Sequence, residues 1–243
     1  MQNPSVHKLF LEQLKYYSRR DQSAGASPVI SLFLEWAKTK KIKGDLKVGE
    51  FGGAAGQLLN QIGKIYPKVK LTNIEFIEGY RKHQVSEKII FVYSSILDSH
   101  LKDKTFDCLI IRDVLHHVVG QSFKESQENQ IKALKELWRL LRPGGAIFIE
   151  ELVNESFFRC RLIYIFSRLN SKLGFRSKLL QITPNTILAF RSPENLKIMA
   201  REIFGAKNII GGFYQRNQSD WKVKLAHLGG NSGKLLIVVE KRY

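Results

Sequence analysis

Small residues follow an acidic residue near position 50. An apolar segment from Leu46 ends at Glu50, and the small residues behind it are Gly52, Gly53, Ala54, Ala55 and Gly56. Small side chains let the backbone turn tightly and approach a ligand closely. A helix that begins after such a loop presents free N–H groups and the positive end of its dipole. The pattern predicts a ligand site at a strand-to-helix turn, although a purely structural turn has the same composition.

A second carboxylate follows the next apolar segment. Glu75 ends the run from Val69 to Ile74 and lies 25 residues after Glu50. An acid at this point can accept hydrogen bonds from ribose hydroxyls, whereas a lone acid at a strand end is more often a helix cap or a solvated charge. The loop reads Glu-x-Gly-x-Ala-x-Gly and not Gly-x-Gly-x-x-Gly, which argues against a nicotinamide or flavin dinucleotide.

Alternating short strands and helices position these residues. We expect strands at 46–51, 69–75, 89–93, 106–111, 145–150, 206–214 and 234–240. We expect helices at 6–20, from Ser27-Pro28 to Trp36, at 55–66, at 124–141 and from Ser192-Pro193-Glu194 onward, with a turn or short helix after 75. Strands separated by helices imply βαβ units and a parallel sheet with right-handed crossovers. The predicted fold class is a doubly wound α/β sheet.

Five segments in this order resemble the motifs of class I S-adenosylmethionine-dependent methyltransferases. They are Glu50 to Gly56, Glu75, 91–98, 106–118 and 140–150. The resemblance covers roughly residues 45–150, with a tail from 192. It implies a seven-stranded sheet with an antiparallel last strand, N-terminal helices and a helical insertion after strand five. It also implies S-adenosyl-L-methionine as the cofactor, a helical cap over 1–44, and a binding domain over 45–243 with its insertion at about 152–191.

The resemblance assigns cofactor contacts by position. The glycine loop would surround the methionine part, Glu75 would bind the ribose and Phe76 would pack on the adenine. Two residues after strand three would flank the base, and two after strand four would line the floor. The expected set is Glu50, Phe51, Gly52, Gly53, Ala54, Gly56, Glu75, Phe76, Ser95, Ile96, Arg112 and Asp113. Many relatives have aspartate in place of Ser95, so we expect a weaker adenine contact, or one made by the backbone near Ser95.

A histidine pair follows strand four, close to the expected cofactor floor. His116 and His117 suit general-base catalysis at neutral pH if the acceptor is a hydroxyl or an acidic carbon. The alternative is that the pair packs or caps the loop. In the N-terminal segment, Arg19 or Arg20 would pair with the methionine carboxylate, and Tyr16 or Tyr17 would close the pocket; solvated surface charge is the other interpretation.

The charge is unusual for a globular chain. The 243 residues are 44% hydrophobic and carry a formal net charge of +17. Residues 1–150 hold 23 basic and 16 acidic side chains (net +7), and residues 151–243 hold 16 and 6 (net +10). This imbalance favours an anionic partner such as nucleic acid, a phosphorylated substrate or a lipid surface, although solubility is a sufficient alternative explanation.

Several classes are disfavoured. Cys108 and Cys160 provide neither a disulfide framework nor metal-ligand spacing, so we expect no metal and a cytoplasmic location. No apolar run approaches the roughly 18 residues that would span a bilayer, and Met1 to Lys8 lacks the apolar core of a secretory signal. Cys160 lacks the Pro-Cys setting of cytosine-C5 methyltransferases, and the Asp/Asn-Pro-Pro-Tyr segment used on exocyclic amines is also missing.

The expected insertion is basic and apolar. No acid occurs between Glu155 and Glu194, whereas seven basic residues do: Arg159, Arg161, Arg168, Lys172, Arg176, Lys178 and Arg191. A lid over a small molecule, contact with an anionic membrane surface, an RNA grip and a helix packed on the sheet all fit this composition. The predicted function is methyl transfer to oxygen or carbon of a small, partly hydrophobic acceptor. The alternative is an RNA-binding protein or RNA methyltransferase that uses the basic C-terminal half.

Overall fold

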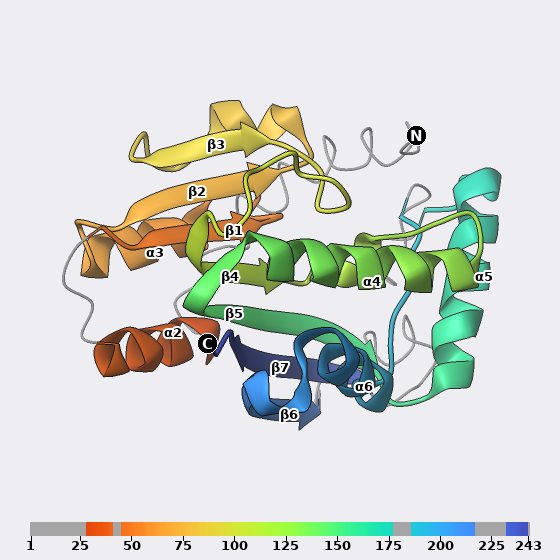
Figure 1. Cartoon of the computed structure of the whole chain (residues 1–243). Coiled ribbons are helices and arrows are strands. Elements are labelled where there is room, and N and C mark those ends of the chain that lie inside the picture. The colour runs from red at the N-terminus through yellow and green to blue at the C-terminus, as the bar shows by residue number, and fades with distance from the viewer. Residues whose placement is uncertain (1–27, 41–44, 177–185, 217–231, 243) are drawn as a thin grey trace.

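The computed structural model describes residues 28–40, 45–176, 186–216 and 232–242. The helix expected at 6–20 and the cap expected at Ser27 lie outside these residues. The strands are β1 (Lys47–Phe51), β2 (Lys70–Glu75), β3 (Ile89–Tyr93), β4 (Phe106–Arg112), β5 (Leu141–Asn154), β6 (Ile209–Arg216) and β7 (Ser232–Glu240). They form one seven-stranded sheet in the order β3-β2-β1-β4-β5-β7-β6 (Figure 1). Because β7 runs antiparallel to both neighbours and β1 to β5 pair in parallel, the predicted fold class is confirmed.

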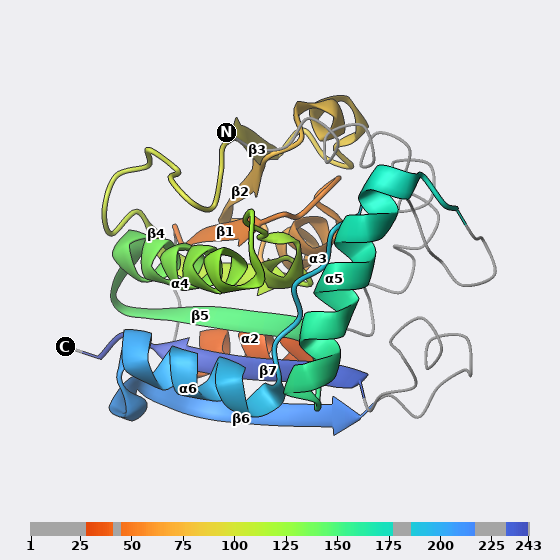
Figure 2. The same ribbon diagram turned by 90° about the vertical axis from the view of Figure 1, so that its right-hand side faces the viewer.

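Helices cover both faces and one edge of the sheet. They are α2 (Pro28–Thr39), α3 (Gln57–Ile65), α4 (Phe123–Leu140), α5 (Phe157–Leu173) and α6 (Pro193–Phe204), with the 3-10 turns η2 (Glu78–His83), η3 (Leu115–His117) and η4 (Ala206–Asn208). Helices α4 and α6 lie on one face and α2 and α3 on the other, while α5 crosses the carboxyl ends of the parallel strands (Figures 1 and 2). None of the described helices is long and apolar enough to cross a membrane.

Strand β4 shows how the two faces are filled. Its side chains alternate between two buried clusters, as the period of two in a strand requires. Leu109 and Ile111 pack toward α4 and α6, whereas Cys108 and Ile110 pack toward α2 and α3. Burial raises the pKa of the Cys108 thiol, which packs among the apolar side chains of this face.

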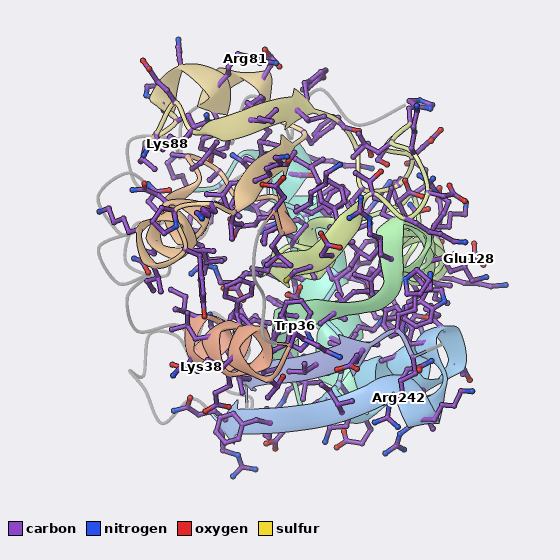
Figure 3. The ribbon with its side chains drawn as sticks, turned by 60° about the vertical axis from the view of Figure 1, so that its left-hand side comes forward. Trp36, Lys38, Arg81, Lys88, Glu128 and Arg242 are labelled. Atoms are coloured by element: carbon purple, nitrogen blue, oxygen red, sulfur yellow. The ribbon has the colours of Figure 1, made fainter. Side chains whose placement is uncertain are left out.

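Helix α2 is part of this core. Phe33 and Trp36 pack edge-on against Phe148 of β5, at centroid distances of 6.2 and 6.1 Å. Figure 3 shows Trp36 on the side of α2 that faces the sheet and Lys38 on the far side. The separation of a cap over 1–44 from the rest of the chain stays a prediction.

Serine caps set three helix starts. The side-chain oxygens of Ser122, Ser156 and Ser192 accept hydrogen bonds from the backbone N–H groups of Glu125, Arg159 and Asn195, at 3.0, 3.4 and 3.2 Å. A serine at this position satisfies one of the free N–H groups of the first turn. The start predicted at Ser192-Pro193-Glu194 is therefore confirmed.

Two strands differ from their expected bounds by three residues or more at one end at least. Strand β5 begins at Leu141 and ends at Asn154, because its antiparallel pairing with β7 continues as far as Asn154 opposite Ser232. Strand β6 begins at Ile209 and not at 206, because residues 206–208 form the turn η4. A buried strand and its flanking turn have similar residue types, so periodicity alone does not fix such ends.

Removal of the Phe148 ring should destabilise the protein strongly. Phe148 is fully buried between Phe33 and Trp36, so Phe148→Ala should lower the free energy of unfolding by about 3–5 kcal/mol through lost burial and a cavity. Phe148→Leu should cost about 1 kcal/mol and covers the case in which the alanine variant does not fold. Urea denaturation followed by circular dichroism measures both, and Ile90→Ala, at a site 60% exposed, is the control. A loss below 1 kcal/mol for Phe148→Ala would refute this packing.

Candidate functional site

The glycine loop turns sharply after β1. Gly52 has φ 70°, and the non-glycine Ala54 has φ 49°. A Cβ atom at Gly52 would lie 2.4 Å from Cγ2 of Val114. One at Gly53 would lie 2.6 Å from Oδ1 of Asn73 and 2.7 Å from a carboxylate oxygen of Glu50. The loop therefore needs glycine at both positions, because one rests on the β4 loop and the other on buried polar atoms beneath it.

Glu75 fastens the loop to the end of β2. Its two carboxylate oxygens accept hydrogen bonds from the backbone N–H groups of Ala54 at 3.0 Å and Ile77 at 3.1 Å. Burial raises the pKa of Glu75, and the backbone hydrogen bonds oppose that shift. A carboxylate accepts about four hydrogen bonds, so Glu75 retains capacity for ligand hydroxyls.

The expected adenine side lies at the ends of β2 and β3. The ring of Phe76 stacks on that of Tyr93 with centroids 6.1 Å apart. Ile96 is buried, and Oγ of Ser95 accepts a hydrogen bond from the backbone N–H of Leu97 at 3.2 Å. These groups offer an apolar wall and a polar edge, which suit a flat heterocycle.

A partly exposed cation, Lys234, bridges two carboxylates at the floor beside the end of β4. The Nζ atom of Lys234 lies 2.9 Å from Oδ2 of Asp113 and 2.6 Å from Oε1 of Glu150. Burial lowers the pKa of Lys234, but the two carboxylates outweigh it and raise the pKa overall. Asp113, next to Arg112, has φ 55°, and its buried Oδ1 has no hydrogen-bond partner among the described residues. That oxygen is an available acceptor for a donor on a ligand.

His116 has a carboxylate partner. Its Nδ1 atom contacts Oε1 of Glu151, whose other oxygen accepts the backbone N–H of Leu115 at 2.7 Å. Burial lowers the pKa of His116, but attraction and hydrogen bonding to Glu151 outweigh it, so the pKa is raised from 6.5. Nε2 of His116 has no hydrogen-bond partner in the described part of the chain. The pair is thus an oriented imidazole of the kind found in general bases.

His117 has a different environment. Its ring centroid lies 4.1 Å from that of His116. Burial, followed by the charge of His116, holds the pKa of His117 well below 6.5. Of the two expected candidates, His116 has the stronger geometry for proton transfer.

The backbone around His116 is fixed by a side chain of α4. The amide of Gln130 donates to the carbonyls of Leu115 at 3.0 Å and Ala189 at 2.7 Å. The N–H of Ala189 donates to the carbonyl of His116 at 2.9 Å, and the ring of Phe190 stacks on His116 at 5.0 Å. The segment beyond α5 therefore forms one wall around the imidazole.

The structure brings the two expected motifs together. Val114 contacts Gly52 and lies two residues before His116, so the histidine loop and the glycine loop share one edge.

Sequence reasoning missed Glu151, Lys234 and Gln130. The signal for Glu151 was available, since two consecutive acids interrupt the apolar run of β5, and buried acids need partners. Tyr16, Tyr17, Arg19 and Arg20 lie outside the described residues.

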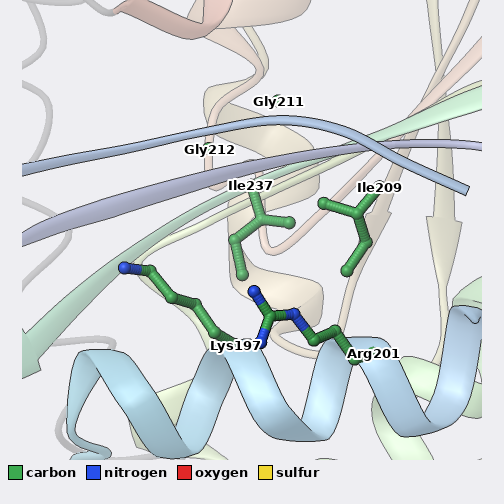
Figure 4. A pocket seen from close by; sticks show the side chains of 6 residues that line it. All are labelled: Lys197, Arg201, Ile209, Gly211, Gly212 and Ile237. Atoms are coloured by element: carbon green, nitrogen blue, oxygen red, sulfur yellow. The ribbon is translucent and has the colours of Figure 1, made fainter. Parts of the chain in front are cut away.

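A depression of about 230 Å³ lies between α6 and the strands β6 and β7 (Figure 4). Its lining residues are Lys197, Arg201, Ile209, Gly211, Gly212 and Ile237. Strand β6 is four strand positions from β1, roughly 20 Å at the usual strand spacing. This depression is therefore separate from the glycine loop.

The sheet order, the antiparallel β7 and the glycine loop after β1 define a Rossmann-like fold. Residues 48–149 match the family model of the methyltransferase domain. None of the curated proteins compared with the chain matches it significantly.

Solved structures share the fold at low identity. An S-adenosylmethionine-dependent methyltransferase from Methanosarcina mazei has a TM-score of 0.62 and 14% identity, with 89% of this chain and 98% of that chain covered. An arsenic(III) S-adenosylmethionine methyltransferase from Chlamydomonas reinhardtii has a TM-score of 0.57 and 14% identity, with 81% of this chain and 64% of that chain covered. A phosphoethanolamine N-methyltransferase 2 from Haemonchus contortus was solved in complex with S-adenosyl-L-methionine. It has a TM-score of 0.57 and 12% identity, with 83% of this chain and 50% of that chain covered.

The match to the family model spans fewer than half of the 243 residues, and the solved structures are less than 25% identical to the chain; together they show a methyltransferase-type Rossmann-like fold. S-adenosyl-L-methionine is the cofactor named for these three solved structures. Three features of the site are compatible with that cofactor. They are the loop that needs glycine at positions 52 and 53, the hydrogen bonds that Glu75 can still accept, and the buried Oδ1 of Asp113, which has no hydrogen-bond partner among the described residues. The acceptors named for the neighbours differ in chemistry, so the shared fold does not determine the acceptor.

A thermal-shift titration tests the residue assignments. S-adenosylhomocysteine at about 100 times its dissociation constant should stabilise the fold by about 2.7 kcal/mol, and NAD should give no shift. Glu75→Gln should weaken S-adenosylhomocysteine binding at least tenfold, because the amide places a donor where the carboxylate accepts from Ala54 or Ile77. Glu78→Gln, at an exposed acid three residues away, is the matched control. Equal affinity in Glu75→Gln and wild type would remove Glu75 from the site.

Proposed function

We propose that the protein is an S-adenosylmethionine-dependent methyltransferase, which transfers the methyl group of this cofactor to an oxygen or carbon of a small, partly hydrophobic acceptor, with His116 as general base. The observation that carries this proposal is the buried His116–Glu151 pair, two residues beyond the contact between Val114 and Gly52. A base held at the edge where the cofactor loop lies is placed to deprotonate an acceptor next to the cofactor.

S-adenosyl-L-methionine supplies, when bound, a methyl group on a positively charged sulfur that needs no further activation. The glycine loop, Glu75 and Asp113 would hold it, with Phe76, Ser95 and Ile96 around the adenine. The task left to the chain is to orient the acceptor and to remove its proton. Nε2 of His116 would accept a proton from a hydroxyl or an acidic carbon, and Glu151 would stabilise the resulting imidazolium.

The surroundings of His116 favour an acceptor with apolar surface. Phe190 stacks on the imidazole, and Cys160 and Ile163 of α5 pack behind Phe190 in one buried cluster. Apolar walls exclude water and strengthen the interaction of the base with its proton donor. An enol or a phenol combines an apolar body with one ionisable group, and such compounds are the first acceptors to test.

The pH dependence of turnover tests the role of His116. A base must be neutral, so kcat/KM for a phenolic or enolic acceptor should rise with pH to a plateau, with a midpoint above 6.5 because Glu151 raises the pKa of His116. Release of S-adenosylhomocysteine measures the rate. His116→Asn should lower kcat by about 10²–10⁴-fold. Glu151→Gln should lower kcat and move the midpoint to lower pH, because burial then dominates the pKa of His116.

The control is His100→Asn, since the side chain of His100 is 85% exposed and far in sequence from the pair. It should leave both the rate and the midpoint unchanged. Cofactor affinity is measured for every variant. Full turnover by His116→Asn with intact S-adenosylhomocysteine binding would remove the base from the mechanism, and an unchanged midpoint in Glu151→Gln would remove Glu151 as its positioning residue.

A further inference from the structure

Helix α5 has two apolar stripes on opposite sides. One faces the protein and contains the buried residues Cys160, Ile163 and Tyr164. The other, here called the outer stripe, contains Phe158, Leu162, Ile165, Leu169 and Leu173. Its members are spaced three or four residues apart and therefore line up along one side of the helix. Phe158 is 67% exposed and Leu173 is 80% exposed, so the outer stripe covers no core.

Basic side chains border the outer stripe. Arg161 and Lys172 lie on one flank of it and Arg159 on the other, as the 100° step per residue places them. These three side chains make no ion pair with any described residue. No acid occurs from 156 to 193, so nothing in this stretch of sequence neutralises them.

The outer stripe and its cations suit one kind of partner. A second copy would bring like charges together on a chain of net charge +17. Single-stranded nucleic acid stacks on aromatic rings. Four of the five stripe residues are aliphatic, and the exposed rings on this side of α5 are Phe158 within the stripe and Phe166 beside it. An anionic lipid surface supplies apolar depth for the stripe and negative headgroups for its flanks.

The position of α5 relates this surface to the site. The helix lies across the carboxyl edge of the sheet (Figure 2), and its inner stripe packs on Phe190, which stacks on His116. The outer stripe is thus one helix diameter from the wall of the imidazole.

We propose that α5 docks the protein on an anionic lipid surface through the outer stripe and its flanking cations. Docking itself is independent of the reaction. Its consequence, that the acceptor is an amphiphile taken from the lipid surface, rests on the proposed function.

Vesicle cosedimentation with the full chain tests the docking. Wild type should bind vesicles of 70% phosphatidylcholine and 30% phosphatidylglycerol, bind vesicles of phosphatidylcholine alone at least tenfold more weakly, and lose affinity for the anionic vesicles as salt rises. The triple variant Ile165→Gln, Leu169→Gln, Leu173→Gln should bind the anionic vesicles at least tenfold more weakly than wild type. Glutamine retains helix propensity, so α5 should persist.

Matched variants distinguish binding through this surface from nonspecific binding through other exposed apolar residues or through net positive charge. Ile90→Gln with Ile198→Gln removes two exposed apolar residues on β3 and α6 and should leave vesicle binding unchanged. Arg161→Gln with Lys172→Gln should lower affinity for anionic vesicles by about 25-fold, or fivefold for each charge. Lys68→Gln with Lys88→Gln, at exposed lysines elsewhere, should have less than half of that effect on a logarithmic scale.

Three results would overturn the docking proposal. They are equal vesicle binding by the stripe triple variant and wild type, concentration-dependent dimerisation that the triple variant abolishes, and RNA binding in place of vesicle binding that the same variant abolishes. The S-adenosylhomocysteine shift and turnover of a soluble phenol report separately on the proposed function. Vesicle binding without turnover would leave the docking intact and refute the base chemistry, whereas turnover without vesicle binding would do the reverse.

Discussion

Parallel pairing of β1 with both β2 and β4 is the constraint on which the site depends. It directs the carboxyl ends of three central strands to one edge, so the glycine loop, Glu75 and the histidine loop meet there although they are distant in sequence. The contact between Gly52 and Val114 records how closely two of these loops approach. A longer side chain at Gly52 would separate them.

That edge concentrates buried carboxylates in a strongly basic chain. Glu50, Glu75, Glu150 and Glu151 are each no more than 5% exposed. An isolated buried charge is energetically costly. Three of these carboxylates have identified partners: backbone N–H groups for Glu75, Lys234 for Glu150 and His116 for Glu151. The same partners determine chemistry, since they leave acceptor capacity on Glu75 and raise the pKa of His116. Local stability and the proposed activity therefore rely on the same groups.

The sequence predicted most of the fold and the approach of the glycine loop to the histidine loop; the ligand contacts assigned to these residues stay predictions. Apolar periodicity and glycine placement located β1, β2 and the loop between them, because local residue types determine a strand followed by a tight turn. The partner of His116 was missed because Glu151 comes from a strand 35 residues away and its proximity depends on tertiary pairing. Lys234 is more distant from the histidine loop in sequence, and the antiparallel pairing of β7 with β5 places it near the site. Exposure of the outer stripe also needed the structure, because its apolar residues alone are equally compatible with a packed helix.

A crystal structure with bound S-adenosylhomocysteine would show whether Glu75 and His116 both face the cofactor. We expect the ribose hydroxyls within hydrogen-bond distance of Glu75. We also expect the sulfur to face His116, roughly 5–7 Å from Nε2, which leaves room for a methyl group and an acceptor atom. A ligand whose ribose lies away from Glu75, or whose sulfur is shielded from His116 by protein, would contradict this arrangement.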